Sequence, residues 1–304
     1  MDRLGVAAAP DESTLRKLFA RVDAEALDQQ VGAFVWTRTR EAGARRVIAL
    51  DGKTVRGARS RGEESSAAPH LVAAFDHVGG TVLGQVAVAD KSNEIPAVQD
   101  LLSRFDLKDA LVTVDAMHTQ ADTAQTITNA GGDYVFTVKN NQPKLRAACK
   151  RLPWTDVPAR RVTVTGHGRT VTRTIKVLNA PDWISFASTT QIGRVQRTVT
   201  KAGKKTVEVT YVITSADHVT APPAVLADWV QGHWGIENRL HWIRDVTFDE
   251  DRSQVRTGHA PQVMATVRDI AISLLRLRGW TNIAEGLRHH SHDPDRALTC
   301  LLTC

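Results

Sequence analysis

The sequence predicts an α/β fold: a mixed β-sheet core with a β-rich insertion, preceded by a small N-terminal helical segment. Apolar residues recur at helical spacing near the N-terminus, short β-rich runs then alternate with helical stretches, and a later stretch has alternating Thr and Val. With 304 residues, of which 42% are hydrophobic, the chain is long enough to bury a large core.

The N-terminal segment is predicted to be helical and to occupy residues 1–45. Residues 12–36 have apolar side chains at steps of three or four residues, and Ser13 is the expected helix cap. The remaining residues, 46–304, are predicted to form a single α/β domain.

The core begins with three β-rich runs at residues 47–52, 70–77 and 81–90, the last two joined through Gly79 and Gly80 as a hairpin. A helix opened by Ser92 or Asn93 follows. Next come a short strand that ends on Asp115, a helix over residues 119–130 and a strand over residues 133–139. Three antiparallel strands followed by strand-helix units are typical of a ribonuclease H-like core.

The β-rich insertion is predicted at about residues 141–218. Residues 160–215 alternate Thr and Val with Gly-containing turns, which is typical of strands. The helical period returns after Pro223 and continues, with a break near Gly258, to about Arg278.

The charge is positive and unevenly distributed. The formal net charge is +6 and the sequence pI is about 9.4, but residues 139–176 alone hold ten basic side chains against one acid, Asp156. This distribution favours an anionic partner. The three cysteines form neither a paired framework nor a CxxC motif, and no signal peptide or membrane-spanning run is visible, so we expect a cytoplasmic protein without membrane association.

Two aspartates end β-rich runs: Asp51 is followed by Gly-Lys-Thr and Asp115 by Ala-Met-His. If the two runs are neighbouring strands, their carboxylates are close enough to bind hard divalent cations, which take one or two carboxylates plus water and phosphate oxygens. Without further context, an Asp in such a place is more often a turn former or a helix cap than a metal ligand.

A third carboxylate is predicted in the stretch around GHWGIENRLHWIRD. Helical spacing puts His233, Glu237, His241 and Arg244 on one face, with Arg239 and Arg244 near enough to hold a phosphate. The tryptophans at 234 and 242 are expected to anchor this helix. Glu237 also fits a solvated carboxylate paired with its neighbours, and the acids at 245 and 249–251 fit a solvated loop.

The motifs ALDGKTVRGAR, KSNEIPAV, VTVDAMHTQ, GGDYVFTVKNNQPKL, GHWGIENRLHW and DVTFDED occur in order along the chain. Together they closely resemble the ISAs1 transposases, an IS4-like group of DDE transposases that includes the H-repeat-associated proteins. The resemblance covers about residues 12–301. It implies a ribonuclease H-like core and a β-strand insertion between the second Asp and the Glu.

The resemblance implies that Asp51, Asp115 and Glu237 are the catalytic residues and hold one or two Mg²⁺ or Mn²⁺ ions. The implied partner is double-stranded DNA, both transposon ends and target, bound by a homo-oligomer in a bacterial, nucleoid-associated setting. The supporting residues are expected to be His118, His233, Asn238 and His241. The expected DNA-binding residues are Lys53, Arg56, Lys139, Lys144, Arg160, Arg161, Arg169, Arg173, Arg239 and Arg244.

The implied activity is cleavage and transfer of DNA strands. Two alternatives remain open: a DNA-binding relic without transposition, and a metal-dependent nuclease without strand transfer. The IS4 group often has Tyr, Arg and Lys near its Glu, where this chain has Val230, His233 and Arg244. Relatives usually begin with a longer helical region, so a truncated N-terminus is expected.

Overall fold

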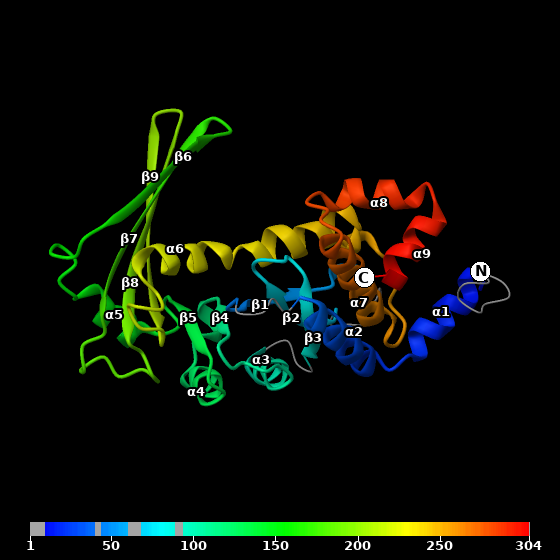
Figure 1. The fold of residues 1–304 in the computed structure, drawn as a ribbon, viewed down its shortest axis with the longest axis horizontal. Coiled ribbons are helices and arrows are strands. Elements are labelled where there is room, and N and C mark those ends of the chain that lie inside the picture. Colours follow the sequence, from blue (N-terminus) through cyan, green and yellow to red (C-terminus); the bar gives the residue numbers. More distant parts are fainter. Residues whose placement is uncertain (1–9, 40–43, 60–67, 89–93, 304) are drawn as a thin grey trace. The chain divides into compact units, whose positions relative to one another are not determined.

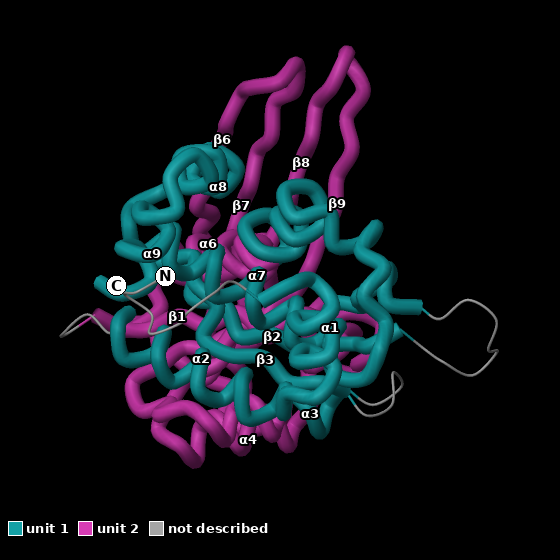
Figure 2. Tube along the Cα trace, turned by 90° about the vertical axis from the view of Figure 1, so that its right-hand side faces the viewer, with its two compact units in different colours: residues 1–42, 52–97, 237–304 teal, residues 43–51, 98–236 magenta. Residues whose placement is uncertain are grey.

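The computed structural model describes residues 10–39, 44–59, 68–88 and 94–303. The chain divides into two compact units (Figure 2). Unit 1 contains residues 1–42, 52–97 and 237–304, and unit 2 contains residues 43–51 and 98–236.

Unit 2 is built on a large mixed sheet with the strand order β1-β4-β5-β9-β8-β7-β6 (Figure 1). Strands β1, β4 and β5 are parallel, and every pairing from β5 outward is antiparallel. The strands are β1 (Val47–Thr54), β4 (Leu111–Val114), β5 (Asp133–Val138), β6 (Arg160–Gly166), β7 (Arg169–Asn179), β8 (Gln191–Lys201) and β9 (Lys204–Thr214). Strand β1 continues past Asp51 into unit 1.

Helices α4 (Ala121–Asn129), α5 (Pro143–Lys150) and α6 (Pro223–Gly232) belong to the same unit. Leu226 of α6 packs with Val47, Leu111 and Val212 in one apolar cluster on the sheet. This burial of aliphatic side chains from consecutive strands holds β1 and β4 in place.

Four long strands of unit 2 form two hairpins that we call the arm, residues 160–179 and 191–214. Each hairpin turns through two residues with positive φ: His167 and Gly168 in the first, Ala202 and Gly203 in the second. Such turns match the twist of paired strands. The insertion predicted at about 141–218 thus contains the strands expected from the Thr and Val alternation, together with α5.

Unit 1 contains a β-hairpin and most of the remaining helices. Gly80, at φ +69, turns the hairpin as expected. The elements are α1 (Glu12–Arg21), α2 (Ala24–Arg38), β2 (His70–Asp76), β3 (Val82–Val88), the π-helices η4 (Glu237–His241) and η5 (Ile243–Thr247), the 3₁₀ helix η6 (Glu250–Arg252), α7 (Ala260–Leu277), α8 (Ile283–Ser291) and α9 (Pro294–Thr303). Helix α3 (Glu94–Ser103) crosses the boundary between the units.

Two helix predictions are corrected. The single N-terminal helix is two helices separated at Val22 and Asp23, and the cap of the first is Asp11, not Ser13, because the Asp11 carboxylate accepts from the Thr14 amide. Asp23 caps the second helix in the same way through Ala26. The predicted caps Ser92 and Asn93 lie outside the described residues. Within the described ranges, each helix is too short or too polar to cross a lipid bilayer.

Candidate functional site

The two predicted aspartates follow facing residues of two neighbouring parallel strands of unit 2. In the β1–β4 register Leu50 faces Val114, and Asp51 and Asp115 are the next residue on each strand. Parallel strands lie about 4.8 Å apart, and residues at equivalent positions project from the same face. The predicted neighbourhood of the two strands is therefore observed, but β1 continues to Thr54, so Asp51 lies within its strand and only Asp115 follows the end of one.

Asp115 is ionised and partly open to solvent. Its side chain is 49% exposed, and Lys139 Nζ lies 3.1 Å from Oδ1. Partial burial raises the pKa of this carboxyl, but hydrogen bonds from the Ala116 amide and Lys139, with the charges of Lys139 and His233, outweigh it and hold the pKa below its usual value. Lys139, predicted to contact DNA, thus pairs with Asp115.

The loop after Asp115 is held from the next strand and the residues beyond it. Asn141 donates to the Ala116 carbonyl, Gln142 donates to the Thr119 carbonyl at 2.9 Å, and the Thr119 hydroxyl donates to Thr137 at 2.7 Å. His118 lies in this loop and is 1% exposed. These contacts fix the backbone that presents Asp115, as a metal-binding carboxylate requires.

His233 lies against the strand that ends at Asp115. Its Nδ1 is 3.0 Å from the Thr113 hydroxyl, and the ring is 9% exposed. Burial lowers its pKa to about 4 against the opposing charge of Asp115. A histidine that stays neutral at pH 7 can orient neighbours by hydrogen bonding without adding positive charge next to Asp115.

In unit 1, Glu237 begins a π-helical stretch, not an α-helix. The π-helices η4 and η5 run from Glu237 to Thr247 with wider turns than the α-helical spacing assumed from the sequence. The prediction that His233, Glu237, His241 and Arg244 share one α-helical face is therefore wrong. Glu237 and Asn238 are exposed.

Other side chains of this segment also differ from prediction. Leu240 and Ile243 are buried and anchor it, but Trp234 and Trp242 are 42% and 56% exposed, so the expected tryptophan anchors are wrong. Burial lowers the pKa of His241 to about 3, with nearby Arg244 adding to the effect, so this histidine is also neutral.

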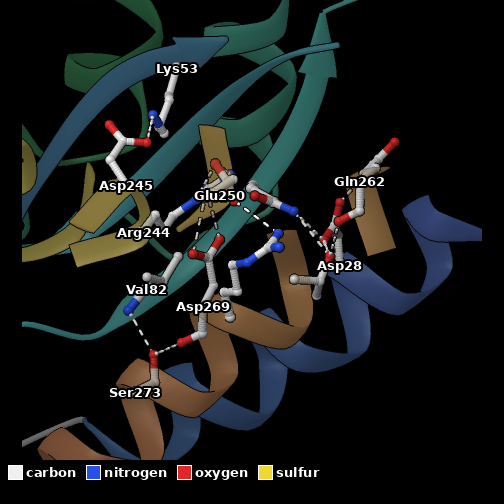
Figure 3. Close-up of polar contacts among 12 residues, drawn as sticks. Asp28, Lys53, Val82, Arg244, Asp245, Glu250, Gln262, Asp269 and Ser273 are labelled. Atoms are coloured by element: carbon white, nitrogen blue, oxygen red, sulfur yellow. Dashed lines mark hydrogen bonds and ion pairs between the residues drawn. The ribbon is translucent and has the colours of Figure 1, made fainter. Parts of the chain in front are cut away.

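Several cations near Glu237 are occupied by protein partners. The Arg244 side chain is 1% exposed and pairs with Glu250 and Asp269, while the Lys53 side chain is 9% exposed and its Nζ lies 2.6 Å from Asp245 Oδ1 (Figure 3). In this structure both cations, which were predicted to contact phosphate, are paired with acids of the protein. The solvated loop expected for the acids at 245 and 249–251 is wrong for Glu250, which is 0% exposed, whereas Asp249 is 56% exposed as expected.

Arg239 and Arg56 differ from those two cations. Arg239 Nη1 donates to the His77 carbonyl at 2.8 Å and its guanidinium stacks 5.7 Å from the Phe75 ring centre. The Arg56 side chain is 79% exposed and its Nη1 lies 3.7 Å from Asp251. Arg56 thus remains accessible to a nucleic acid, whereas Arg239 serves mainly to hold its segment against the β2–β3 hairpin.

The arm is strongly basic. Its residues include ten Lys or Arg against a single acid, Glu208, a net +9 in a chain whose total is +6. All seven residues of β6, including Arg160 and Arg161, are exposed. The basic stretch predicted from the sequence ends at Lys176 and omits five cations of β8 and β9: Arg194, Arg197, Lys201, Lys204 and Lys205. A count of charged residues over the whole strand-rich stretch, 160–215, includes them.

Like charges are directly opposed on the arm. Arg173 faces Arg197 across the β7–β8 pairing. Burial, with Arg197 and Arg169 nearby, lowers the pKa of Arg173. Opposed cations destabilise a sheet unless an anion joins them. Two tryptophans lie in the neighbouring sequence: Trp154 is buried against Tyr211, whereas Trp183 is 57% exposed.

The donor set fits a hard divalent cation in part. The Asp51 and Asp115 carboxylates offer oxygen ligands at adjoining positions of β1 and the end of β4, and Mg²⁺ commonly takes one or two protein carboxylates with water and phosphate completing its shell. Among the residues that the structure describes, no group of three or more His, Cys, Asp or Glu side chains is arranged around a common metal position.

Similar proteins place the chain in a family. The E. coli K12 proteins YbfL and the H repeat-associated YhhI are each 35% identical over 244 residues, 75% of this chain and 64% of their own length. YncI of E. coli O157:H7, provisionally named a transposase like YhhI, is 33% identical over 284 residues, 88% of this chain and 71% of its own length. The chain thus spans less than two thirds of YbfL and YhhI.

One solved structure, a piggyBac transposase synaptic complex with hairpin DNA, is similar at a TM-score of 0.41 and 12% identity, over 92% of this chain and 64% of that chain. A similarity this low carries no conclusion about fold or function. Residues 42–274, by contrast, match the family described as Transposase DDE domain. This match covers most of the protein, and the chain therefore belongs to the transposase DDE domain family.

Proposed function

We propose that this chain is a DDE transposase of the ISAs1 type that cleaves and joins DNA strands with Asp51, Asp115 and Glu237. The observation that supports this most directly is the pair of aspartates at equivalent positions of the parallel strands β1 and β4 in a chain of this family. Glu237 is the third residue of the proposal by its match to the family motif, and its side chain is exposed.

In this proposal the three carboxylates hold one or two Mg²⁺ or Mn²⁺ ions. Such ions, when bound, activate the attacking water or 3′-hydroxyl and stabilise the leaving oxygen. The protein supplies ionised, fixed carboxylates: Lys139 and the Ala116 amide keep Asp115 charged, and the loop contacts of Asn141 and Gln142 keep it in place. His233 stays neutral beside Asp115 and orients Thr113.

We further propose that the arm binds the phosphates of double-stranded DNA. Its single acid and ten cations give it the electrostatic character of a nucleic-acid surface. Phosphates placed between Arg173 and Arg197 would relieve the repulsion of that opposed pair. Lys144, on α5, is exposed and extends the positive surface within unit 2. Pairing of two DNA ends by a homo-oligomer is part of the same proposal.

The test uses the purified chain, Mn²⁺ and duplex DNA from the borders of its own gene. We expect nicked or cut ends and joined products, and Asp51→Asn or Asp115→Asn should reduce both to background because each removes a charged ligand. Asp156→Asn, an exposed acid of the same unit, is the matched control and should keep full activity.

The products separate the functions. Cleavage without joining would support a metal-dependent nuclease, and binding without either reaction a DNA-binding relic. Full cutting by both Asp→Asn variants would contradict the proposed site.

A further inference from the structure

The segment that presents Glu237 is fixed to the rest of unit 1 by its own charged side chains. Arg239 donates to the His77 carbonyl, and its guanidinium lies against Gly80 at the hairpin turn. Five residues later Arg244 enters a buried ion network, and Asp245 pairs with Lys53 (Figure 3). The contacts of Arg239, Arg244 and Asp245 therefore hold residues 237–247 in unit 1, a segment with few buried apolar side chains.

The network around Arg244 is buried, and burial raises the pKa of its Asp269 carboxyl to about 7. Arg244 Nε and Nη2 donate to Glu250 at 2.9–3.1 Å, Nη1 lies 3.4 Å from Asp269, and Arg268 Nη1 completes it at 3.1 Å from Glu250. Two guanidiniums thus face two carboxylates. Nearby acids raise the pKa of Arg244 despite its burial, so it remains charged. A buried cation of this kind is stable only with its partners in place.

Helix α7, which supplies Arg268 and Asp269, is itself tied to its neighbours. Ser273 accepts from the Val82 amide at 2.9 Å, and Asp28 of α2 accepts from Gln262 at 2.7 Å and from Gln85 at 2.9 Å. The network therefore connects the Glu237 segment to a rigid framework of α2, β3 and α7.

The Lys53–Asp245 pair differs from the network in what it connects. Lys53 lies on β1, two residues after Asp51, and alternate residues of a strand project from the same face. Asp245 lies on η5, eight residues after Glu237. The 2.6 Å ion pair therefore joins the strand that carries the first proposed carboxylate to the segment that carries the third.

We infer that Lys53 and Asp245 form a positioning pair, which fixes the Glu237 segment to the part of β1 that lies in unit 1. This inference rests on the proposed function for its catalytic meaning. Lys53 is 9% exposed and Asp245 34% exposed, so the pair is shielded from salt better than a surface ion pair. Supporting contacts of metal ligands typically change activity by about 10- to 100-fold when removed.

The test reverses the pair. Lys53→Glu and Asp245→Lys are made singly and together, with Arg252→Glu as control, because Arg252 forms an exposed ion pair with Asp249 in the same unit. For Mn²⁺-dependent cleavage we expect each single variant to lower kcat by about 10- to 100-fold with KM for DNA within about twofold, and the double variant to recover most of the loss. Lys53→Arg should remain close to wild type.

Hydrogen exchange of the amides of residues 237–247 is the second readout, and it requires no activity. The single variants should exchange faster in this segment and the double variant should restore protection. If the wild-type chain fails to cut DNA but this pattern holds, the proposed function fails while the positioning contact stands. Unchanged exchange and kcat in the single variants would overturn the inference, as would a raised KM that the double variant does not rescue, which would identify Lys53 as a DNA contact.

Discussion

The arm and the Glu237 segment use the same residue types in opposite surroundings. Ten cations of the arm have one acid among them, and β6 is exposed throughout. Around Glu237, by contrast, Arg244 and Lys53 are buried against Glu250, Asp269 and Asp245. The positive charges of the arm are thus available to an anionic ligand, whereas Arg244 and Lys53 are neutralised by ion pairs within the protein. A count of basic residues in the sequence cannot separate these cases, because it does not include the partners.

The largest effect is expected when one of the buried cations is removed. Arg244→Met leaves Glu250 and Asp269 without their shared cation, and loss of one partner of a buried ion pair costs about 3–5 kcal/mol. Urea unfolding measures the free energy directly. Arg252→Met, on an 84% exposed side chain, should change it by less than about 0.5 kcal/mol. Similar losses in both variants would mean that burial does not distinguish the two arginines.

The second prediction concerns the buried, neutral His233 and the dependence of stability on pH. The pKa of His233 is lowered to about 4, below its unfolded value, so the native state binds fewer protons than the unfolded state between these pH values. The stability contributed by neutral His233 is present above pH 6.5 and is lost as the pH falls through about 4.

The His233→Gln variant should therefore lose less stability than wild type over this range, by up to about 3 kcal/mol. Unfolding free energies at pH 7, 5.5 and 4 give the slopes. Parallel slopes for the two proteins would show that His233 titrates normally.

The exposed side of the comparison is tested by salt dependence. Replacing Arg169, Arg173, Arg197 and Lys201 with Ala should reduce the slope of log affinity for duplex DNA against log salt by about 3 to 4, near 0.9 per lost phosphate contact. Fluorescence anisotropy from 50 to 200 mM salt measures it.

The control removes the same charge from exposed residues of unit 1, Arg16, Lys17, Arg252 and Arg288. It should leave the slope nearly unchanged. Equal slopes for the two quadruple variants would show that the net charge, not the arm, attracts DNA.

The smallest expected effect concerns the lone acid of the arm. Glu208 faces Arg197 in the β8–β9 pairing. Glu208→Gln removes an exposed competitor for phosphate, so DNA affinity should rise by about two- to fivefold, the range of a surface ion pair. The same anisotropy assay at constant salt detects it. Weaker binding would mean that Glu208 orients Arg197 for DNA instead of competing for it.

Much of the core could be predicted because its signals are local. The apolar runs before Asp51 and Asp115 predicted both strands, and their parallel pairing places the aspartates side by side. The turns at Gly80 and Gly131 were predictable because these positions need positive φ. Apolar spacing gave no sign of the break at Val22, since it continues through the break, although Asp11 and Asp23 supplied two cap signals.

The surroundings of Glu237 could not be predicted in the same way. An α-helical period was assumed, and the π-helical turns change which side chains share a face. The partners of Arg244 include Asp269, 25 residues away, and Lys53 lies 192 residues from Asp245. Contacts at such separations follow from tertiary packing, and a single sequence without aligned relatives does not contain them.

The pairing of β1 with β4 constrains the number of residues in β1 before Asp51. Deleting or adding one residue within 47–50 would turn Asp51 to the opposite side of its strand, as any one-residue register slip does. Extra residues at the arm tips, beside Gly168 or Gly203, would leave both aspartates where they are. On the proposed function, a chain with one residue gained or lost in that short run would be inactive even if every other residue were kept.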